Sequence, residues 1–167
     1  MADTGWKSPT ATGEKYNDWT NPTNAYSSDD AYATATDASP AKHQSYESFN
    51  FGIPSEAIIS GVIVSVEGLS SGAVGGVYLK YWSESDDAWS DYKDVFWGSS
   101  TSTQSEGSDS DLWGRTPVDT DFSDANFSVE VYTTADEYGF TQSLDHIKVK
   151  IYYIGRTTGP LPMFKRQ

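Results

Sequence analysis

The sequence predicts an all-β fold, a two-sheet antiparallel β-sandwich of the jelly-roll kind, on three observations. Polar and apolar side chains alternate in several short runs, and no long window carries a 3.6-residue apolar period. Ser, Thr, Asp, Gly, Val and Tyr dominate while Leu and Met are scarce, which suits pleated strands joined by polar turns. Aromatic residues make up 14% of the 167 residues, enough to anchor the core of one domain.

The alternation is clearest over residues 144–154. Ile147, Val149 and Ile151 fall on one face, and Lys148 and Lys150 on the other. A period of two is typical of a strand with one buried and one wet face. Similar patterns predict further strands over 31–36, 46–51, 74–82, 95–97 and 126–133.

The most apolar segment, 53–67, is expected to be a strand with a bulge. Pro54 cannot lie in the middle of a sheet, so it marks the entry to the strand. Ile59 is out of phase with Val62, and one extra residue at Ser60–Gly61 restores the register. Residues 98–111, almost wholly Ser, Thr, Gly and acid, are expected to form a mobile loop or a polar hairpin.

The chain is expected to divide into an extended N-terminal segment (1–15), the sandwich domain (16–154) and an extended C-terminal arm (155–167). Residues 1–154 carry 8 basic and 24 acidic residues, a net charge of −16, and the arm adds +3. An apolar and basic arm on an acidic domain suggests a strap that binds a partner; the alternative is a frayed terminus. The expected contact residues of the arm are Arg156, Leu161, Met163, Phe164, Lys165 and Arg166.

Composition narrows the function. The chain has no cysteine, which excludes disulfides and thiolate metal sites. Its start shows no apolar signal-peptide region, and no stretch approaches the roughly 20 apolar residues of a membrane span. A net charge of −13 argues against direct binding of nucleic acid.

Catalytic motifs are missing from the sequence. The only histidines, His43 and His146, lie in polar surroundings without a Gly-x-Ser-x-Gly elbow. The acidic residues gather in Ser- and Gly-rich loops rather than beside aromatic residues in strands, which does not favour a glycosidase carboxylate pair. We therefore expect no enzymatic activity and no cofactor.

One acidic turn superficially matches a calcium loop. Asp119, Asp121 and Ser123 have the spacing of calcium ligands, with Glu130 eleven residues after Asp119. However, Asp124 replaces the turn-forming glycine, and Glu130 falls within an alternating strand. A solvated acidic turn without bound metal is the preferred interpretation.

Four aromatic residues are close together in sequence around an expected hairpin: Trp82, Trp89, Tyr92 and Trp97. Exposed rings of this kind stack on sugars in carbohydrate-binding modules. The alternative is that they fill the core and edges of the sandwich.

Several motifs recur in a fixed order. They are W-x-N-P-x-N-A followed by D-x-x-Y-A within 19–33, F-x-F-x-I-P with a following Gly-centred apolar run over 49–64, L-W-G at 112–114 with N-F-x-V at 126–129, and the closing strand 145–153. The set resembles a family of jelly-roll proteins of tailed-phage structural modules. Ser128 departs from that pattern, which has glycine there, and the link over 115–117 is shorter than usual.

The resemblance implies a phage virion structural protein, and we expect a capsid decoration or cement protein located in the virion and assembled in the host cytoplasm. Its expected partners are the major capsid protein or other virion proteins, and further copies of the chain, with neither nucleic acid nor membrane. The alternative is a carbohydrate-binding or adhesin-type module on a tail fibre or a cell-surface protein.

Overall fold

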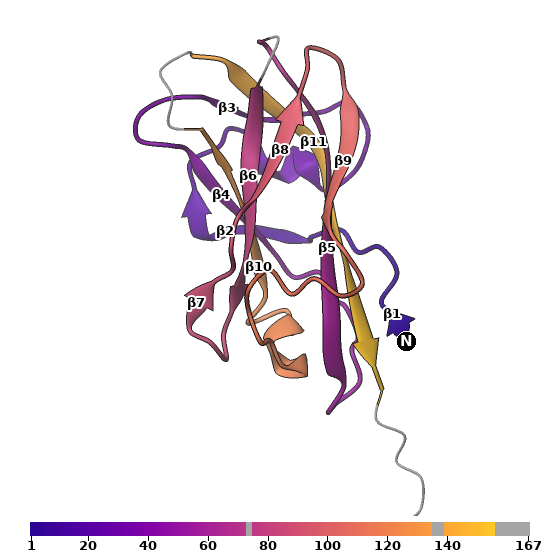
Figure 1. Cartoon of the computed structure of the whole chain (residues 1–167). Coiled ribbons are helices and arrows are strands. Elements are labelled where there is room, and N and C mark those ends of the chain that lie inside the picture. Colours follow the sequence, from indigo (N-terminus) through magenta and orange to yellow (C-terminus); the bar gives the residue numbers. More distant parts are fainter. Residues whose placement is uncertain (73–74, 135–138, 156–167) are drawn as a thin grey trace, which may run out of the picture.

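The computed structural model describes residues 1–72, 75–134 and 139–155, which form two antiparallel sheets packed face to face (Figure 1). Sheet A consists of β1 (Ala2–Asp3), β3 (Ala33–Thr36), β5 (Ile58–Ser70), β9 (Ser102–Gly107) and β11 (Thr141–Ile154). Sheet B consists of β2 (Ala11–Asn17), β4 (His43–Glu47), β6 (Gly75–Ser83), β7 (Ala88–Trp89), β8 (Lys93–Trp97) and β10 (Ser128–Thr133). Two short 3-10 helices, η1 (Pro22–Ala25) and η2 (Asp119–Phe122), lie in the connections.

The strand order in sheet A is β1-β11-β5-β9, with β3 also paired to β11. The order in sheet B is β2-β4-β10-β6-β7, with β8 also paired to β6. Most neighbouring strands are far apart in sequence, as the long connections of a jelly roll require, while β6 pairs with the nearby β7 and β8. The predicted two-sheet antiparallel sandwich is confirmed.

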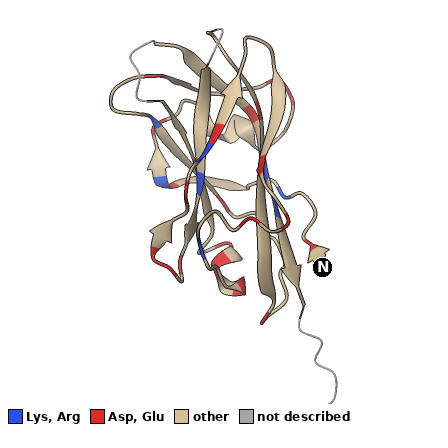
Figure 2. Cartoon of the chain, viewed as in Figure 1, with Lys and Arg blue, Asp and Glu red and all other residues tan. Residues whose placement is uncertain are grey.

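The core lies between the inner faces of the two sheets. Sheet A contributes Val64, Ile147 and Val149, and sheet B contributes Leu79 and Val131, all fully buried. The period-two pattern therefore does point its apolar side chains inward, as the sequence predicts. Figure 2 shows that the acidic residues lie mainly in the loops and turns between strands.

The predicted bulge in β5 is confirmed. Tyr152 pairs with Gly61 and Tyr153 with Ile59, so Ser60 is the extra residue. Glycine is required beside it because a Cβ atom on Gly61 would lie 2.3 Å from the carbonyl oxygen of Ser108.

Two predictions about strands are wrong. The strand expected over 46–51 ends at Glu47, because Ser48 and Asn50 take positive φ angles of 57° and 51° that a strand cannot contain. The polar run 98–111 is more ordered than expected, since β9 within it pairs with β5. Its Ser- and Thr-rich side chains conceal the strand because β9 is an edge strand with little apolar surface to bury.

The N-terminal segment contributes β1 and the start of β2, and each pairs with a strand of the sandwich. All six expected contact residues of the C-terminal arm fall in 156–167, outside the described residues. Within the described part of the chain, no helix has the length and apolarity needed to cross a membrane.

Candidate ligand-binding face

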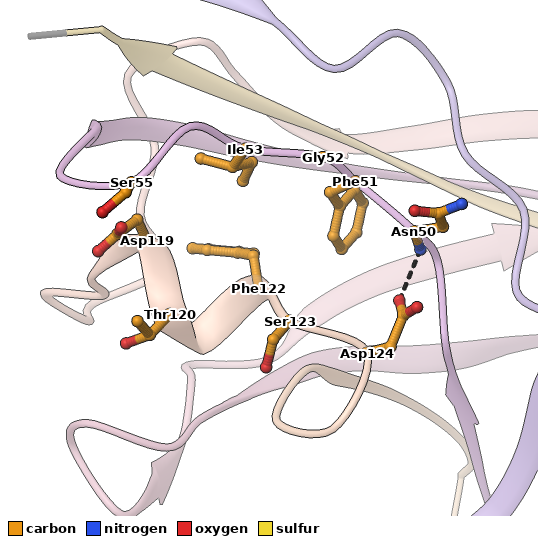
Figure 3. Close-up of a pocket in the computed structure, with 10 residues that line it drawn as sticks. All are labelled: Asn50, Phe51, Gly52, Ile53, Ser55, Asp119, Thr120, Phe122, Ser123 and Asp124. Atoms are coloured by element: carbon orange, nitrogen blue, oxygen red, sulfur yellow. Dashed lines mark hydrogen bonds between the residues drawn. The ribbon is translucent and has the colours of Figure 1, made fainter.

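The acidic turn proposed as a calcium candidate lies in η2, at one end of the sandwich (Figure 3). The Asp121 carboxylate is buried and accepts hydrogen bonds from the Ser85 amide (2.7 Å), the Ser85 hydroxyl (2.6 Å) and the Val118 amide (2.8 Å). Asp119 accepts a hydrogen bond from the Glu56 amide at 2.7 Å. The carboxylates thus fasten η2 to neighbouring loops.

A metal site is not assembled at this end. Among the described residues, no three His, Asp or Glu side chains converge closely enough to hold a metal ion. A cavity of about 370 Å³ lies between η2 and residues 50–55, with Phe51 and Phe122 as its apolar wall. Both rings are buried in the core, so the cavity offers no exposed aromatic face for stacking.

The outer face of sheet B is richer in chemistry. Register brings side chains from four strands and one loop into a line across this sheet, because Tyr132 of β10 lies opposite His43 of β4 and Tyr78 of β6. We call this line the aromatic row; its members are Tyr16, His43, Tyr132, Tyr78 and Tyr92. Successive ring centroids are 5.1, 5.2, 5.0 and 5.2 Å apart.

The inner rings of the aromatic row stack against one another, so their faces are covered. His43 and Tyr132 are inclined by only 14° at a centroid distance of 5.2 Å, which requires an offset stack. The ends are different: Tyr16 is exposed, and Tyr92 meets Tyr78 edge to face and is 59% exposed. Faces for an external ligand are therefore available at the ends of the row rather than in its middle.

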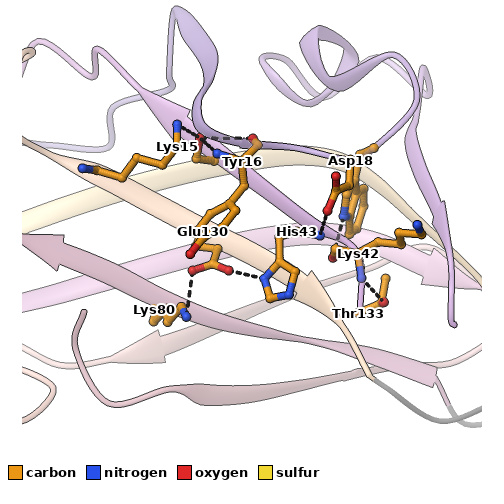
Figure 4. A network of polar contacts seen from close by, with 10 residues as sticks. Lys15, Tyr16, Asp18, Lys42, His43, Lys80, Glu130 and Thr133 are labelled. Atoms are coloured by element: carbon orange, nitrogen blue, oxygen red, sulfur yellow. Dashed lines mark hydrogen bonds and ion pairs between the residues drawn. The ribbon is translucent and has the colours of Figure 1, made fainter. Parts of the chain in front are cut away.

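A buried carboxylate lies beneath the aromatic row. Glu130 is 0% exposed, pairs with the Lys80 ammonium group at 2.9 Å, and also contacts Nδ1 of His43 (Figure 4). The Lys80 ammonium group lies 5.0 Å from the ring centroid of Trp89 and 5.1 Å from that of Tyr132. One ion pair thereby fixes the positions of rings on three strands.

The phenol of Tyr132 is protonated at neutral pH, as an ordinary tyrosine is. Burial, and after it the charge of Glu130, raises its pKa further, to about 12. A protonated phenol both donates and accepts hydrogen bonds, as a hydroxyl-rich ligand requires.

Two tryptophans flank the row. Trp82 and Trp89 face each other across β6 and β7, with ring centroids 5.4 Å apart, and Trp89 lies 6.0 Å from Tyr16. The Lys15 ammonium group lies 4.3 Å above the Trp82 ring. These contacts extend the aromatic surface along the strands from the row.

The edge strand β8 supplies the most exposed part of the face. Its outward residues, Asp94 and Phe96, follow Tyr92 at every second position. Phe96 is 60% exposed and lies opposite Gly76, a position without a side chain to cover the ring. Two open rings with a carboxylate between them therefore lie along this edge.

Three of the four aromatic residues singled out from the sequence, Trp82, Trp89 and Tyr92, do gather on this face. Trp97 does not, because it has the parity of the inward-facing Val95 and is 1% exposed in the core. Sequence reasoning missed the aromatic row itself. The available signal was that Tyr78 and Tyr132 fall on the wet side of their alternating strands.

Comparison with known proteins shows the kind of sandwich this is. No protein-family model matches the chain, and no curated protein matches it significantly in sequence. A solved domain designated CBM36-1, from a multidomain xylanase of the hindgut metagenome of Trinervitermes trinervoides, superposes with a TM-score of 0.51 at 14% identity, covering 93% of this chain and 100% of that domain. This is the jelly-roll fold of carbohydrate-binding modules. A structure designated CBM4 is also similar, at a TM-score of 0.46 and 10% identity over 87% of this chain and 93% of that one.

The predicted phage virion protein is wrong, because the matched fold is that of a carbohydrate-binding module. The expected partners (capsid protein, other virion proteins and further copies of the chain) are withdrawn with it, while no finding tests the expected location. The motifs behind the resemblance explain the error. Trp19 and Ala25 are buried, and Asn21 takes a φ of 52° at the entry to η1, so these residues determine a fold and carry no information about a ligand.

Proposed function

We propose that this chain is a non-catalytic carbohydrate-binding module whose ligand lies on the outer face of sheet B. The observation that carries the proposal is the aromatic row, with exposed rings at its ends and polar groups along it. The proposal replaces a virion role by the other interpretation that the sequence supported.

The chemistry of the face suits a sugar. A pyranose ring has apolar C–H faces and a rim of hydroxyl groups, so it binds where aromatic faces and hydrogen-bonding groups alternate. Tyr92 and Phe96 offer faces, and Asp94 lies between them with a carboxylate that accepts hydrogen bonds.

The face also suits a ligand without charge. Glu130, the buried carboxylate beneath the aromatic row, is already balanced by Lys80, so Lys80 is not available to an anionic group. We therefore expect a neutral polysaccharide chain that crosses the strands from the Tyr92 edge toward Tyr16. The solved domain that shares the fold belongs to a xylanase, so xylan is the first ligand to test.

The test is affinity gel electrophoresis and calorimetric titration with soluble xylan and a panel of neutral glucans. Tyr92→Ala and Phe96→Ala should each weaken binding by about tenfold, or about 1.4 kcal/mol, because each removes an exposed stacking face. Tyr32→Ala is the matched control, since Tyr32 precedes β3 of the other sheet.

Two results would overturn the proposal. One is the absence of binding to every neutral polysaccharide tested. The other is binding by Tyr92→Ala and Phe96→Ala that equals that of the Tyr32→Ala control.

A further inference from the structure

We infer that Trp6, Lys148 and Lys150 form a second site, on the outer face of sheet A, for a sugar that carries a carboxylate. This site shares no residue with the aromatic row. The inference does not depend on the function proposed for sheet B.

The backbone on both sides of Trp6 is fixed to β11, yet its side chain remains exposed to solvent. On one side of it, the Thr4 amide donates to the Ile151 carbonyl at 3.1 Å; on the other, Lys7 and Val149 exchange two backbone hydrogen bonds of 2.8 Å. The Thr4 hydroxyl accepts a further bond from the Ile151 amide at 3.1 Å. Despite this anchoring to β11, the indole is 40% exposed.

The anchoring continues beyond the tryptophan. The Ser8 hydroxyl and Nε2 of His146 are hydrogen-bonded at 2.8 Å, which ties the segment to β11 a third time. Burial, and after it the charge of Lys148, lowers the pKa of His146, so this imidazole is neutral at pH 7. The indole is thus preorganised, and preorganisation reduces the entropy that binding costs.

Two lysine ammonium groups lie close to the Trp6 indole. The ammonium group of Lys150 lies 4.7 Å from the ring centroid and that of Lys148 lies 5.2 Å from it. Cation–π attraction holds both groups beside the ring although they repel each other. Both lysines lie on β11 at positions that face outward, beside the N-terminal segment.

The ammonium groups of Lys148 and Lys150 have no carboxylate partner among the described residues. In a chain with 24 acidic residues, neither ammonium group forms an ion pair among the described residues, whereas Lys80 and Lys93 each do. Glu67 lies opposite His146, not opposite either lysine, and Asp3 is occupied by the Gly5 amide at 2.7 Å. A ligand would have to supply the negative charge.

These steps identify the chemistry of the ligand. The exposed part of the indole can contact the C–H face of a sugar ring, and the two ammonium groups over the ring can bind a carboxylate. A uronic acid unit of an acidic polysaccharide carries both on one ring. The net charge of −13 repels a polyanion at long range, but at physiological salt the screening length is about 8 Å, so the local cations decide the contact.

The experiment is calorimetric titration of the whole chain with polygalacturonate and with its methyl ester, at about 0.15 M salt. We expect the charged polymer to bind at least about tenfold more tightly than the neutral ester. Trp6→Ala and Lys148→Gln/Lys150→Gln should each weaken binding to polygalacturonate by about tenfold or more. Trp6→Tyr, which keeps a ring at this position, should retain most of the affinity.

Matched controls keep the outcomes distinct. Lys42→Gln removes one positive charge elsewhere on the surface and should bind as the wild type does. Tyr92→Ala should also leave polygalacturonate binding unchanged, while it weakens binding of neutral polysaccharides if the sheet B proposal holds. Thermal melting of each variant confirms that it is folded.

Five results would overturn the inference. Four are no binding of polygalacturonate, equal binding of the ester, full binding by folded Trp6→Ala, and equal binding of poly-glutamate, which supplies carboxylates without a sugar. The fifth is loss of polygalacturonate binding in Tyr92→Ala but not in the Trp6 and lysine variants, which would place the acidic ligand on sheet B instead.

Discussion

The outer faces of the two sheets both hold lysines beside aromatic rings, and they differ in how the positive charge is balanced. On sheet B, Lys80 pairs with the buried Glu130 beneath the aromatic row. On sheet A, Lys148 and Lys150 lie beside Trp6 with no such partner among the described residues. The two proposals follow this difference: a neutral ligand where Lys80 is paired, and an anionic one where Lys148 and Lys150 are not.

The largest difference in stability between the two faces is expected when the buried carboxylate of sheet B is removed. Glu130→Ala leaves the half-buried Lys80 without its counter-charge and removes the contact with His43, and we expect it to lower the free energy of unfolding by about 3–5 kcal/mol. Urea unfolding at neutral pH measures the loss. Lys148→Gln, which removes an unpaired cation of the other face, should change stability by less than about 0.5 kcal/mol. A small effect of Glu130→Ala would show that the ion pair does not fix the aromatic row.

A second buried carboxylate of sheet B makes stability depend on pH. Burial raises the pKa of Glu47, at the edge of the sheet B face, despite hydrogen bonds from Ser45 and Ser128 that act in the opposite direction. A carboxyl whose folded pKa is raised binds its proton more tightly when folded, so its contribution to stability is lost as pH rises from the ordinary carboxyl pKa through the raised one.

Glu47→Gln should therefore remove part of the decline in stability over that pH range. Unfolding curves recorded at intervals from acidic to neutral pH measure the slope. Glu56→Gln is the control, because Glu56 is exposed at its loop position. A slope that Glu47→Gln leaves unchanged would contradict the assignment.

The smallest effect is expected at an ion pair outside both faces. Lys93 and Asp111 are 2.8 Å apart, with each side chain about one third exposed. Water and salt screen such a pair, so Lys93→Ala should cost less than about 1 kcal/mol in urea unfolding. The difference between the losses in unfolding free energy of Lys93→Ala and Glu130→Ala measures how much burial increases the contribution of an ion pair. Equal losses would mean that burial does not increase it.

The sequence predicted those features that depend on neighbours along the chain. The alternation in β11 and the bulge at Ser60 are local, and each is found where it was expected. Predictions failed where tertiary context decides. Asn50 leaves the strand that its neighbours suggest, and the polar β9 is a strand only because β5 is available to pair with it.

The sequence alone determined an acidic, cysteine-free all-β sandwich that is rich in aromatic residues, not all of which lie in its core. Only the tertiary structure decided which of those residues share a surface. Tyr16, His43, Tyr78 and Tyr132 are far apart in the chain, and they meet because strand register, set by long-range hydrogen bonding, aligns them across sheet B. The same register buries Trp97 and leaves Trp6 exposed over β11, since a one-residue change of parity moves a side chain to the opposite face.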